Sequence, residues 1–285
     1  MKQTSKSYWT TTITPKDKLL AVDWREVWRY RDLFLLFVDR NFRTAYKQTI
    51  LGPLWFVITP VLSVFVYVAV FGGIANIPTD GVPAVLFYLL GIAIWTYFAS
   101  CVSATSNSFV TNADIFGKVY FPRIIMPLVA VTTNLLTLAI QLAIFAAFYI
   151  GYVATGTTLT LHWQIVLFPL LIVLLALMAV GFGMIFSSLT TKYRDLQIML
   201  TKLISLWVYA TPVIYPLSMV TNPKLHLAMS LNPVTPVMEA AKYALLGQGQ
   251  FSWLWLGYSA ACTLVLLVLG LMLFNKVQKS FMDTV

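Results

Sequence analysis

Charged residues are scarce in this sequence: Asp, Glu, Lys and Arg make up 10% of its 285 residues, while 59% are hydrophobic. Soluble domains carry about 25% charged residues. The composition, with a mean hydropathy of +0.81, therefore excludes a soluble globular protein and predicts an integral membrane protein. Cysteine is also nearly absent, since only Cys101 and Cys262 occur, each inside an apolar run. This excludes a disulfide framework and a cysteine-based metal site, and both are expected to pack as small hydrophobic residues.

Motifs of nucleotide hydrolysis and of hydrolytic catalysis are missing as well. No GxxxxGK(S/T) phosphate-binding loop occurs, so the chain is not expected to hydrolyse ATP itself. No HExxH motif, no pair of carboxylates on one predicted helix and no Ser/His/Asp set with a supporting loop is found. The apolar runs hold almost no ionisable side chain, whereas proton- or ion-coupled carriers need them. Any transport is therefore expected to take its energy from another subunit.

Long apolar runs dominate what is present. A helix needs about 20 apolar residues to cross a bilayer. Six runs reach that length, at about residues 54–75, 84–108, 124–150, 164–189, 198–217 and 252–274. The predicted fold is therefore an all-α integral membrane protein with six transmembrane helices in residues 49–275. Residues 1–48 are predicted to form a cytoplasmic tail and an amphipathic interface helix, and residues 276–285 a cytoplasmic tail.

The segment before the first run is amphipathic. From Asp23 onwards, aromatic and aliphatic residues share one helical stripe and charged residues face elsewhere, which is typical of a helix in the headgroup plane. Packing on a partner protein is a compatible alternative. Arg40, Arg43 and Lys47 follow at spacings of three and four, so one helical face gathers three cations. Such a cluster favours anionic lipid headgroups on the cytoplasmic side.

The distribution of basic residues predicts the orientation. Seventeen of the nineteen Lys and Arg residues fall before residue 48, in the loop 111–123, in the turn 190–202 or in the C-terminal tail, all on one side if six spans occur. Only Lys224 and Lys242 fall on the other side. By the positive-inside rule both termini are predicted to be cytoplasmic. Nucleic-acid binding is not expected, because the basic residues form no continuous patch.

A short helix is predicted before the last run. It opens at Pro236 and stops before Gly247, because proline suits the first turn of a helix and glycine the position after its end. At about 11 residues it is too short to cross a bilayer. It is therefore predicted to be a surface or re-entrant helix.

Five segments occur in a fixed order: DRNFRTAYKQTILGPLWFVITP, NADIFGKVYFPR, TKYRDLQ, TPVIYP and LNPVTPVMEAAKYALLG. Together they resemble the transmembrane subunit of type-2 ABC exporters that export bacterial surface polysaccharides, such as O-antigen, capsule and teichoic acid. The resemblance covers about residues 20–275. Ala45 departs from it, since the family often has a basic residue before this tyrosine, and Arg43 is expected to supply that charge.

The resemblance implies a channel-forming subunit without a cofactor of its own, with ATP and Mg on a partner. The expected partners are a second copy of the chain, two copies of a cytoplasmic ABC ATPase subunit, membrane lipid and a lipid-linked polysaccharide. The expected activity is export of an O-antigen-like polymer on undecaprenyl pyrophosphate from the cytoplasmic to the outer side of the bacterial inner membrane. Export of capsule, teichoic acid, a drug or a small lipid remains an alternative.

The resemblance also implies roles for individual residues. The loop 112–123 resembles a coupling element on the ATPase, with the turn TTKYRD as a second contact; ordinary positive-inside loops are the alternative. The residues chosen for ATPase coupling are Asp114, Lys118, Phe121, Arg123, Tyr193 and Arg194. Arg40, Arg43 and Lys47 are expected to meet the pyrophosphate of the substrate, since cations match phosphate, or simply to anchor the helix in lipid. The expected translocation path has Tyr67, Trp95, Tyr97, Trp207 and Tyr209, and the expected outer gate has Pro236, Glu239 and Tyr243.

An enzyme of another class is the competing hypothesis. A membrane-embedded transferase acting on a lipid-linked sugar would need at least one buried acid or histidine in the membrane. Asp114, Asp195, Glu239, His162 and His226 are all assigned to loops in this sequence. The exporter is therefore the preferred interpretation.

Overall fold

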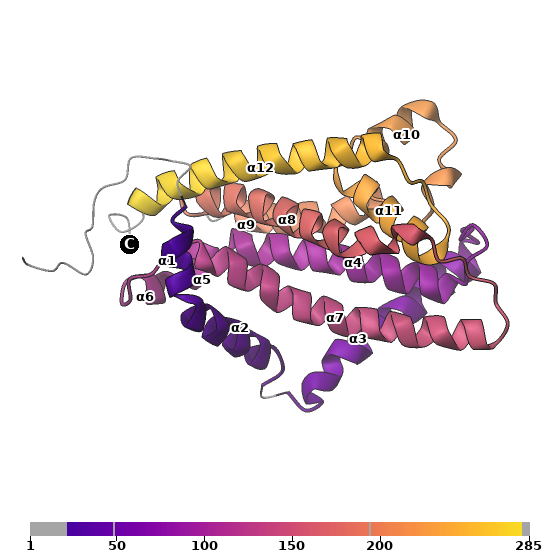
Figure 1. Cartoon of the computed structure of the whole chain (residues 1–285), viewed down its shortest axis with the longest axis horizontal. Helices are drawn as coiled ribbons and strands as arrows, with labels where there is room; N and C mark the ends of the chain where they lie inside the picture. Colours follow the sequence, from indigo (N-terminus) through magenta and orange to yellow (C-terminus); the bar gives the residue numbers. More distant parts are fainter. Residues whose placement is uncertain (1–21, 48, 194, 281–285) are drawn as a thin grey trace, which may run out of the picture.

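The computed structural model describes residues 22–47, 49–193 and 195–280, and every regular element within these residues is a helix. Long helices run side by side along the longest axis of the molecule, and short helices and turns lie at both ends of this bundle (Figure 1). The all-α fold predicted from the apolar runs is therefore confirmed.

Five helices in the described residues are long and apolar enough to cross a membrane. Each has at least 23 residues, more than the roughly 20 that a hydrocarbon core requires. They are Gly52–Ile74, α4 (Ala84–Ser106), α7 (Ile125–Ala154), Trp163–Thr190 and the Trp253–Gln278 portion of α12 (Trp253–Ser280). The fourth joins a 3-10 turn, η3 (Trp163–Leu167), to α8 (Phe168–Thr190).

The first of the five changes its helical geometry along its length. The 3-10 turn η1 (Gly52–Leu54) leads into α3 (Trp55–Tyr67), which continues as the π-helix η2 (Val68–Ile74). Pro60 lies inside α3 without ending it, which membrane helices tolerate. Only 11% of the most apolar 18-residue stretch of this helix is buried inside the protein. The helix therefore lies at the edge of the bundle.

α4 is the centre of the bundle. In its most apolar 18-residue stretch, 72% of the residues are buried inside the protein, against 28% for the corresponding stretch of α7. α4 packs on α7 and on α8, and α8 packs in turn on α12 (Figure 1). Tyr88, Phe98 and Cys101 of α4 are completely inaccessible. The expected burial of Cys101 is therefore confirmed, while Cys262 is only partly buried.

Small residues bring α8 close to its neighbours. A Cβ atom added at Gly181 would lie 2.8 Å from the backbone of Leu266 on α12. One added at Gly183 would lie 2.5 Å from Thr105 on α4. Since neither position has room for a side chain, these glycines allow backbones to approach as closely as membrane helices commonly do.

The stretch 198–217 is not one continuous helix, contrary to the prediction. α9 (Asp195–Trp207) is followed by a single 3-10 turn, η4 (Val208–Ala210), and the chain then leaves helical geometry up to Pro216. Pro212 and Pro216 explain the break, because each removes an amide donor and its ring clashes with a continuing helix. Within the described residues, five helices rather than six reach the length of a membrane span.

Residues 208–216 are here called the broken segment. Side chains from later in the sequence form hydrogen bonds with its backbone carbonyl groups. Asn232 Nδ2 donates a hydrogen bond to Ala210 O over 3.1 Å. The ammonium group of Lys242 donates to Pro212 O. These bonds replace helical ones that the prolines remove, which a buried backbone in a membrane protein requires.

Gly91→Ala is expected to destabilise the protein by about 1–3 kcal/mol, the usual cost of overpacking a core. A Cβ atom at Gly91 would lie 2.7 Å from the carbonyl oxygen of Val213 in the broken segment. Gly151→Ala in α7 is the matched control, because no atom lies within 4 Å of its Cβ position. Thermal unfolding in detergent measures both variants. Equal midpoints for the two would contradict the close contact of α4 with the broken segment.

One end of the bundle, here called the basic end, gathers the turns 107–124 and 190–193. Thr190 Oγ1 donates to Ser106 O over 3.3 Å, which ties the two turns together. The turn 107–124, here called the first turn, contains two short helices, α5 (Ser108–Thr111) and α6 (Ala113–Phe116). The C-terminal part of α12 lies at the same end (Figure 1).

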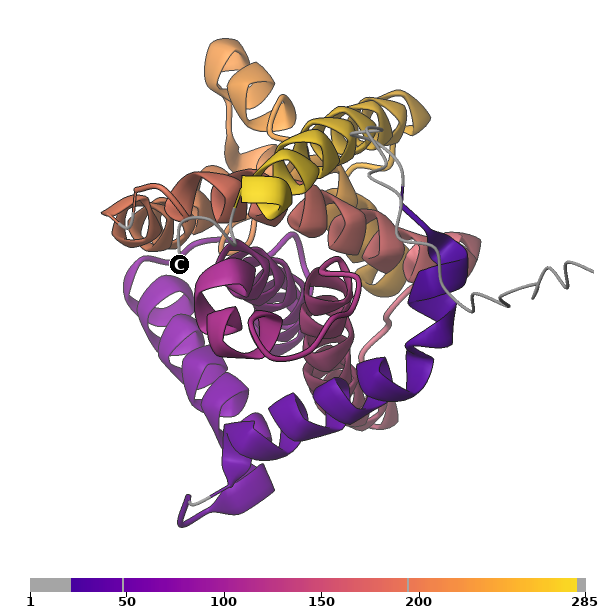
Figure 2. The ribbon, with the colours of Figure 1, turned by 90° about the vertical axis from the view of Figure 1, so that its left-hand side faces the viewer.

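The amphipathic N-terminal segment lies along one edge of the basic end (Figure 2). It forms α1 (Trp24–Arg29) and α2 (Arg31–Tyr46). The Asp23 carboxylate caps α1 by accepting hydrogen bonds from two amides of its first turn, each over 3.2 Å. A helix starting at Asp23 is therefore confirmed, but Tyr30, with φ −92° and ψ 19°, divides the predicted single helix in two.

A second apolar core lies beneath α2, separate from the one around α4. It joins α2 and the first turn to α7, α8 and α12. Its buried members, here called the basic-end core, are Phe37, Val38, Phe109, Phe116, Phe121, Ile125, Met126, Val129, Val180, Met184 and Phe274. α2 is therefore fastened to the bundle by its apolar side, while its charged side faces outward.

The opposite end, here called the far end, gathers the loop 75–83, the segment 155–162 and the chain from residue 217 to residue 246. Ser218 Oγ donates to both carboxylate oxygens of Asp80, over 2.9 and 3.0 Å. The far end holds η5 (Leu217–Met219), α10 (Pro223–Ser230) and α11 (Val234–Leu246). α10 projects away from the bundle (Figure 1).

α11 lies inside the bundle rather than on its surface. Eleven of its 13 residues are buried, and it packs on α4, α8 and α12. It starts at Val234, two residues before the predicted Pro236, and it stops as predicted before Gly247, whose φ of +72° suits glycine. At about 1.5 Å per residue the helix is shorter than a membrane span. The prediction of a short helix is confirmed, and a surface position for it is wrong.

Candidate functional site

The first turn at the basic end carries four of the predicted coupling residues. After α6 the chain is irregular until Ile124. Asp114 and Lys118 are exposed, whereas Phe121 is only 3% exposed and Arg123 is half-buried. The four residues therefore divide into two that a partner can reach and two that hold the turn in place.

Phe121 fastens the turn to the bundle. Its ring centroid lies 5.5 Å from that of Phe116 in α6 and 5.8 Å from that of Phe37 in α2. All three rings belong to the basic-end core. Phe121 was selected as a contact residue, and its burial gives it a supporting place in the turn instead.

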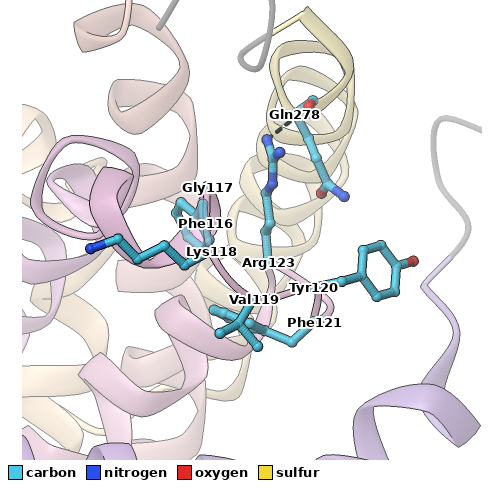
Figure 3. A pocket seen from close by; sticks show the side chains of 8 residues that line it. All are labelled: Phe116, Gly117, Lys118, Val119, Tyr120, Phe121, Arg123 and Gln278. Atoms are coloured by element: carbon cyan, nitrogen blue, oxygen red, sulfur yellow. Dashed lines mark hydrogen bonds between the residues drawn. The ribbon is translucent and has the colours of Figure 1, made fainter.

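Arg123 ties the turn to the C-terminal helix. Its Nη1 donates a hydrogen bond to Gln278 O of α12 over 2.8 Å, as Figure 3 shows. The guanidinium carbon lies 5.4 Å from the centroid of the Phe116 ring. Partial burial lowers the pKa of Arg123 from its ordinary value, but a guanidinium remains charged at neutral pH. The side chain thus joins three segments: the turn, α6 and α12.

The tip of the turn presents side chains that the sequence did not single out. Val119 is 52% exposed and Tyr120 is 67% exposed, beside the exposed Lys118. Figure 3 shows Lys118 and Tyr120 extending to opposite sides of the turn. A depression of about 320 Å³ lies between the turn and Gln278. Apolar and aromatic residues exposed beside a cation are typical of a protein–protein contact. The sequence signal that could have identified Val119 and Tyr120 is their position between Phe116 and Phe121, the two rings that fix the turn.

The second basic turn contributes less to this surface. Tyr193 is 51% exposed, and the Lys192 Nζ atom lies 5.1 Å from its ring centroid. Arg194, the other residue selected there, lies outside the described residues. The turn adjoins the first one through Thr190 and Ser106.

The three cations predicted on one helical face differ in their surroundings. Arg43 Nε lies 2.7 Å from the Asp39 carboxylate. Within the described residues Arg40 makes no such pair; its guanidinium donates to Asn41 Oδ1 over 3.0 and 3.3 Å. Lys47 follows the last residue of α2 and has extended backbone angles. All three side chains are exposed, but the helix carries only two of them, and one of those is paired.

Two of the five aromatic residues predicted for the translocation path come together. The rings of Trp95 in α4 and Trp207 in α9 lie 6.3 Å apart. Phe98 and Phe182 lie 5.4 and 5.2 Å from Trp207. This cluster joins α9 to α4 and α8 just before the broken segment begins.

Among the described residues, no ring contact joins the other three predicted path residues to the tryptophans. Tyr67 contacts Tyr88 edge-on at 6.1 Å. Tyr97 is 3% exposed, whereas Tyr209 is 59% exposed. Only Tyr209 of these three therefore offers a broad surface to the surroundings of the chain.

A buried charge pair lies at the far end, in α11. The Lys242 ammonium is 3.9 Å from Glu239 Oε1, and the two side chains are 2% and 4% exposed. Glu239 falls in the short helix predicted from Pro236, although the transferase hypothesis counted it as a loop residue; it lies in that helix and is buried. Pro236 and Gly247 placed the helix to within two residues, but the sequence gives no direct measure of burial for a short segment.

Each charge of this pair has further partners. Lys242 Nζ donates to Pro212 O and lies 3.9 Å from the centroid of the Phe87 ring. Glu239 Oε2 accepts from the amide of Gln250 over 3.1 Å. α11 is not one of the five long helices. Burial raises the pKa of Glu239 and lowers that of Lys242, and the opposite charge of the partner reduces each of these two pKa shifts. The lysine joins α11 to the broken segment and to α4.

Tyr243 and Pro236 complete the residues selected at the far end. The Tyr243 ring stacks on the His162 ring at 4.2 Å, with an angle of 21° between the planes. His162 Nδ1 lies 3.1 Å from Tyr243 O. Pro236 is buried within the first turn of α11. The three selected residues share α11, and Tyr243 connects it to the segment that precedes α8.

The fold and these two ends define a polytopic membrane protein with an exposed basic turn and a buried charge pair. No cluster of three or more His, Cys, Asp or Glu side chains able to hold a metal ion occurs within the described residues. The chain belongs to the ABC-2 type transporter family, because the model of that family matches residues 32–246. The match includes α2, the first turn, the broken segment and α11.

Relatives with curated names extend the comparison. An O-antigen export system permease protein RfbA from Myxococcus xanthus is 29% identical over 76% of this chain and 81% of its own length. A protein of the same name from Klebsiella pneumoniae is 27% identical over 88% and 94%. The polysialic acid transport protein KpsM from Escherichia coli is 23% identical over 86% and 93%. The chain is similar to each of them over most of both lengths.

Proposed function

We propose that this chain is the transmembrane, channel-forming subunit of an ABC exporter that moves a lipid-linked polysaccharide across the bacterial inner membrane. Membership of the ABC-2 type transporter family is the observation that carries this proposal. Similarity to proteins named for O-antigen export and polysialic acid transport supports a polysaccharide cargo. An O-antigen-like polymer on undecaprenyl pyrophosphate is the preferred cargo within that class.

Energy for transport comes from a separate subunit in this proposal. The sequence has no phosphate-binding loop, and the complete transporter has two copies of this chain and two of a cytoplasmic ABC ATPase. The exposed tip at Lys118, Val119 and Tyr120 is the proposed seat of the ATPase. Its support by Phe121 and Arg123 favours this role, because a rigidly held turn passes a push to the helices it joins.

The basic end faces the cytoplasm in this proposal. Of the described Lys and Arg residues, only Lys224 and Lys242 belong to segments of the far end, as the positive-inside rule requires if the basic end is cytoplasmic. Both termini then lie in the cytoplasm. The exposed cations of α2, Arg40 above all, are the proposed contact for the phosphate of the lipid-linked substrate, since charge-assisted bonds to phosphate suit arginine.

The cargo path and its outer gate are proposed at the other elements described. The Trp95–Trp207 cluster and Tyr209 are candidate sites where aromatic faces contact sugars. α11, with Pro236, Glu239 and Tyr243, is the proposed outer gate. Its contact with the broken segment through Lys242 supports this role, because movement of α11 would pull on a chain segment that lacks helical bonding.

A membrane-embedded transferase is not favoured, although Glu239 is buried. Its Oε2 atom accepts from the Gln250 amide, and its Oε1 atom lies 3.9 Å from the Lys242 ammonium without a hydrogen bond among the described residues. An acid that is packed into a core and held by two partners is poorly placed to act as a general base.

Deletion of this gene is expected to abolish surface polysaccharide while the lipid-linked polymer accumulates inside the cell. An exporter acts after synthesis, so removing it leaves the product on the wrong side of the membrane. Total polymer is measured by gel electrophoresis of whole-cell extracts, and surface polymer by antibody labelling of intact cells. Loss of the polymer from both fractions would instead indicate a biosynthetic enzyme and contradict export.

A further inference from the structure

A series of stacked groups connects the exposed side of α2 to the end of α12. The Arg40 guanidinium lies 4.8 Å from the centroid of the Phe37 ring. Phe37 lies 5.8 Å from Phe121, which lies 5.5 Å from Phe116. The Arg123 guanidinium lies 5.4 Å from the Phe116 ring and bonds to a carbonyl of α12. This ring series begins at a proposed phosphate contact and passes through the turn proposed to bind the ATPase.

The rings of this series have no solvent between them. Phe37 and Phe116 are each 5% exposed, and Phe121 is 3% exposed. Protein interiors are packed as densely as organic crystals and have low compressibility. A displacement of Phe37 therefore meets the ring of Phe121 directly, and Phe121 belongs to the turn whose tip is exposed.

Arg40 is the cation of α2 that is best placed to start such a displacement. Among the described residues it makes no ion pair, whereas Arg43 is held by Asp39. The guanidinium rests on the Phe37 ring and on the Asn41 amide oxygen. A phosphate carries a full negative charge, so its bonds with the guanidinium are stronger than contacts with the uncharged ring and amide oxygen. An arriving phosphate would therefore compete with the ring for Arg40.

We propose that Phe37 is a positioning residue that transmits the binding of a phosphate-bearing lipid headgroup at Arg40 to the ATPase seat, and thereby stimulates ATP hydrolysis. The proposal rests on the proposed function and adds a regulatory step to it. The headgroup is the pyrophosphate of the lipid-linked substrate or the phosphate of an anionic phospholipid, which share the same recognition chemistry. Because Phe37 touches Arg40 on one side and Phe121 on the other, it is the shared element whose arrangement both sites bias.

The test measures ATP hydrolysis by the complete transporter in nanodiscs of phosphatidylcholine alone, with phosphatidylglycerol, or with undecaprenyl pyrophosphate. Wild type is expected to be stimulated about fivefold or more by a phosphate-bearing lipid, within the usual range of coupling between sites. Phe37→Leu keeps an apolar side chain in the core but removes the ring, and its stimulation is expected to fall to about onefold. Stimulation by undecaprenyl pyrophosphate alone would identify the substrate as the source of the signal, and stimulation by phosphatidylglycerol would identify the membrane.

Two variants separate transmission from structural support. Phe37→Tyr keeps the aromatic face and is expected to retain stimulation. Phe34→Leu makes the same change one helical turn earlier, at a ring that packs on the same core, and it is also expected to retain stimulation. Lipid binding, measured by native mass spectrometry, is expected to be at least as strong in Phe37→Leu as in wild type, because the leucine no longer competes with the phosphate for Arg40.

Three results would bear against the ring series in distinguishable ways. Full stimulation of Phe37→Leu would overturn it and leave the export function untouched. Equal loss in Phe37→Leu and Phe34→Leu would reduce Phe37 to a core residue and also overturn it. A chain that never retains an ATPase subunit in purification would overturn the proposed function itself, and the ring series with it.

Discussion

Val119→Asp is expected to separate the chain from its ATPase and to stop export. Val119 is half-exposed at the tip of the first turn and is not a member of the basic-end core, so the substitution removes little internal packing. In a complex, however, the new carboxylate would be buried against the partner without a counter-charge. Loss of a hot-spot residue at the centre of an interface costs about 2 kcal/mol or more, which is about a 30-fold loss of affinity. Co-purification of the ATPase with a tagged chain measures the loss, and surface polysaccharide is expected to fall with it.

Two comparisons make this result specific. Val119→Thr keeps the shape of the side chain without a charge and is expected to retain most of the ATPase. Leu225→Asp places the same charge on α10, at a residue that is 54% exposed at the far end of the bundle. It is expected to co-purify normally. Equal retention of the ATPase by Val119→Asp and Leu225→Asp would remove the turn from the proposed seat.

The membrane character of this fold could be read from the sequence because it depends on local properties. Apolar runs of sufficient length form helices that satisfy their own backbone, whatever else the chain does. The stop of α11 was equally local, since Gly247 takes a left-handed conformation that suits glycine. Capping of α1 by Asp23 is a third case of this kind.

The broken segment was missed because its stability is not local. Pro60 and Pro212 look alike in sequence, yet α3 continues past the first and the helical stretch after α9 has ended by the second. The difference lies in partners that arrive from later in the chain: Asn232 bonds to Ala210 O and Lys242 to Pro212 O. Neither contact has a signal in the segment itself.

The candidate site shows the same division. The resemblance predicted Lys118 and Arg123 as coupling residues of one turn, and both lie in that turn. Charge could not tell that Arg123 bonds to the end of α12, nor that Phe121 is enclosed by Phe37 and Phe116. Burial depends on elements far apart in sequence. The sequence therefore could not show that Val119 is more exposed than Phe121.

Lys242→Met is expected to destabilise the chain by about 3–5 kcal/mol, the cost of leaving a buried charge without its partner. The change removes the donor to Pro212 O and the cation nearest to Glu239, whose side chain is 4% exposed. Lys224→Met is the control, because Lys224 is an exposed lysine at the same end of the bundle. Unfolding in mixed detergent micelles measures both free energies, and export is expected to fail only in Lys242→Met.

A second substitution tests whether the charge is the cause. Glu239→Gln keeps an acceptor for the Gln250 amide and leaves the lysine on Pro212 O, so it is expected to be less damaging than Lys242→Met. The double variant has no buried charge left and is expected to be more stable than Lys242→Met alone by at least about 1 kcal/mol, since neutral replacement of a buried pair is often tolerated. It is not expected to reach wild type, because Pro212 O still lacks its donor. If the double variant is no more stable than Lys242→Met, the damage comes from the lost bond to the broken segment, and the ion pair contributes nothing to holding α11 in place.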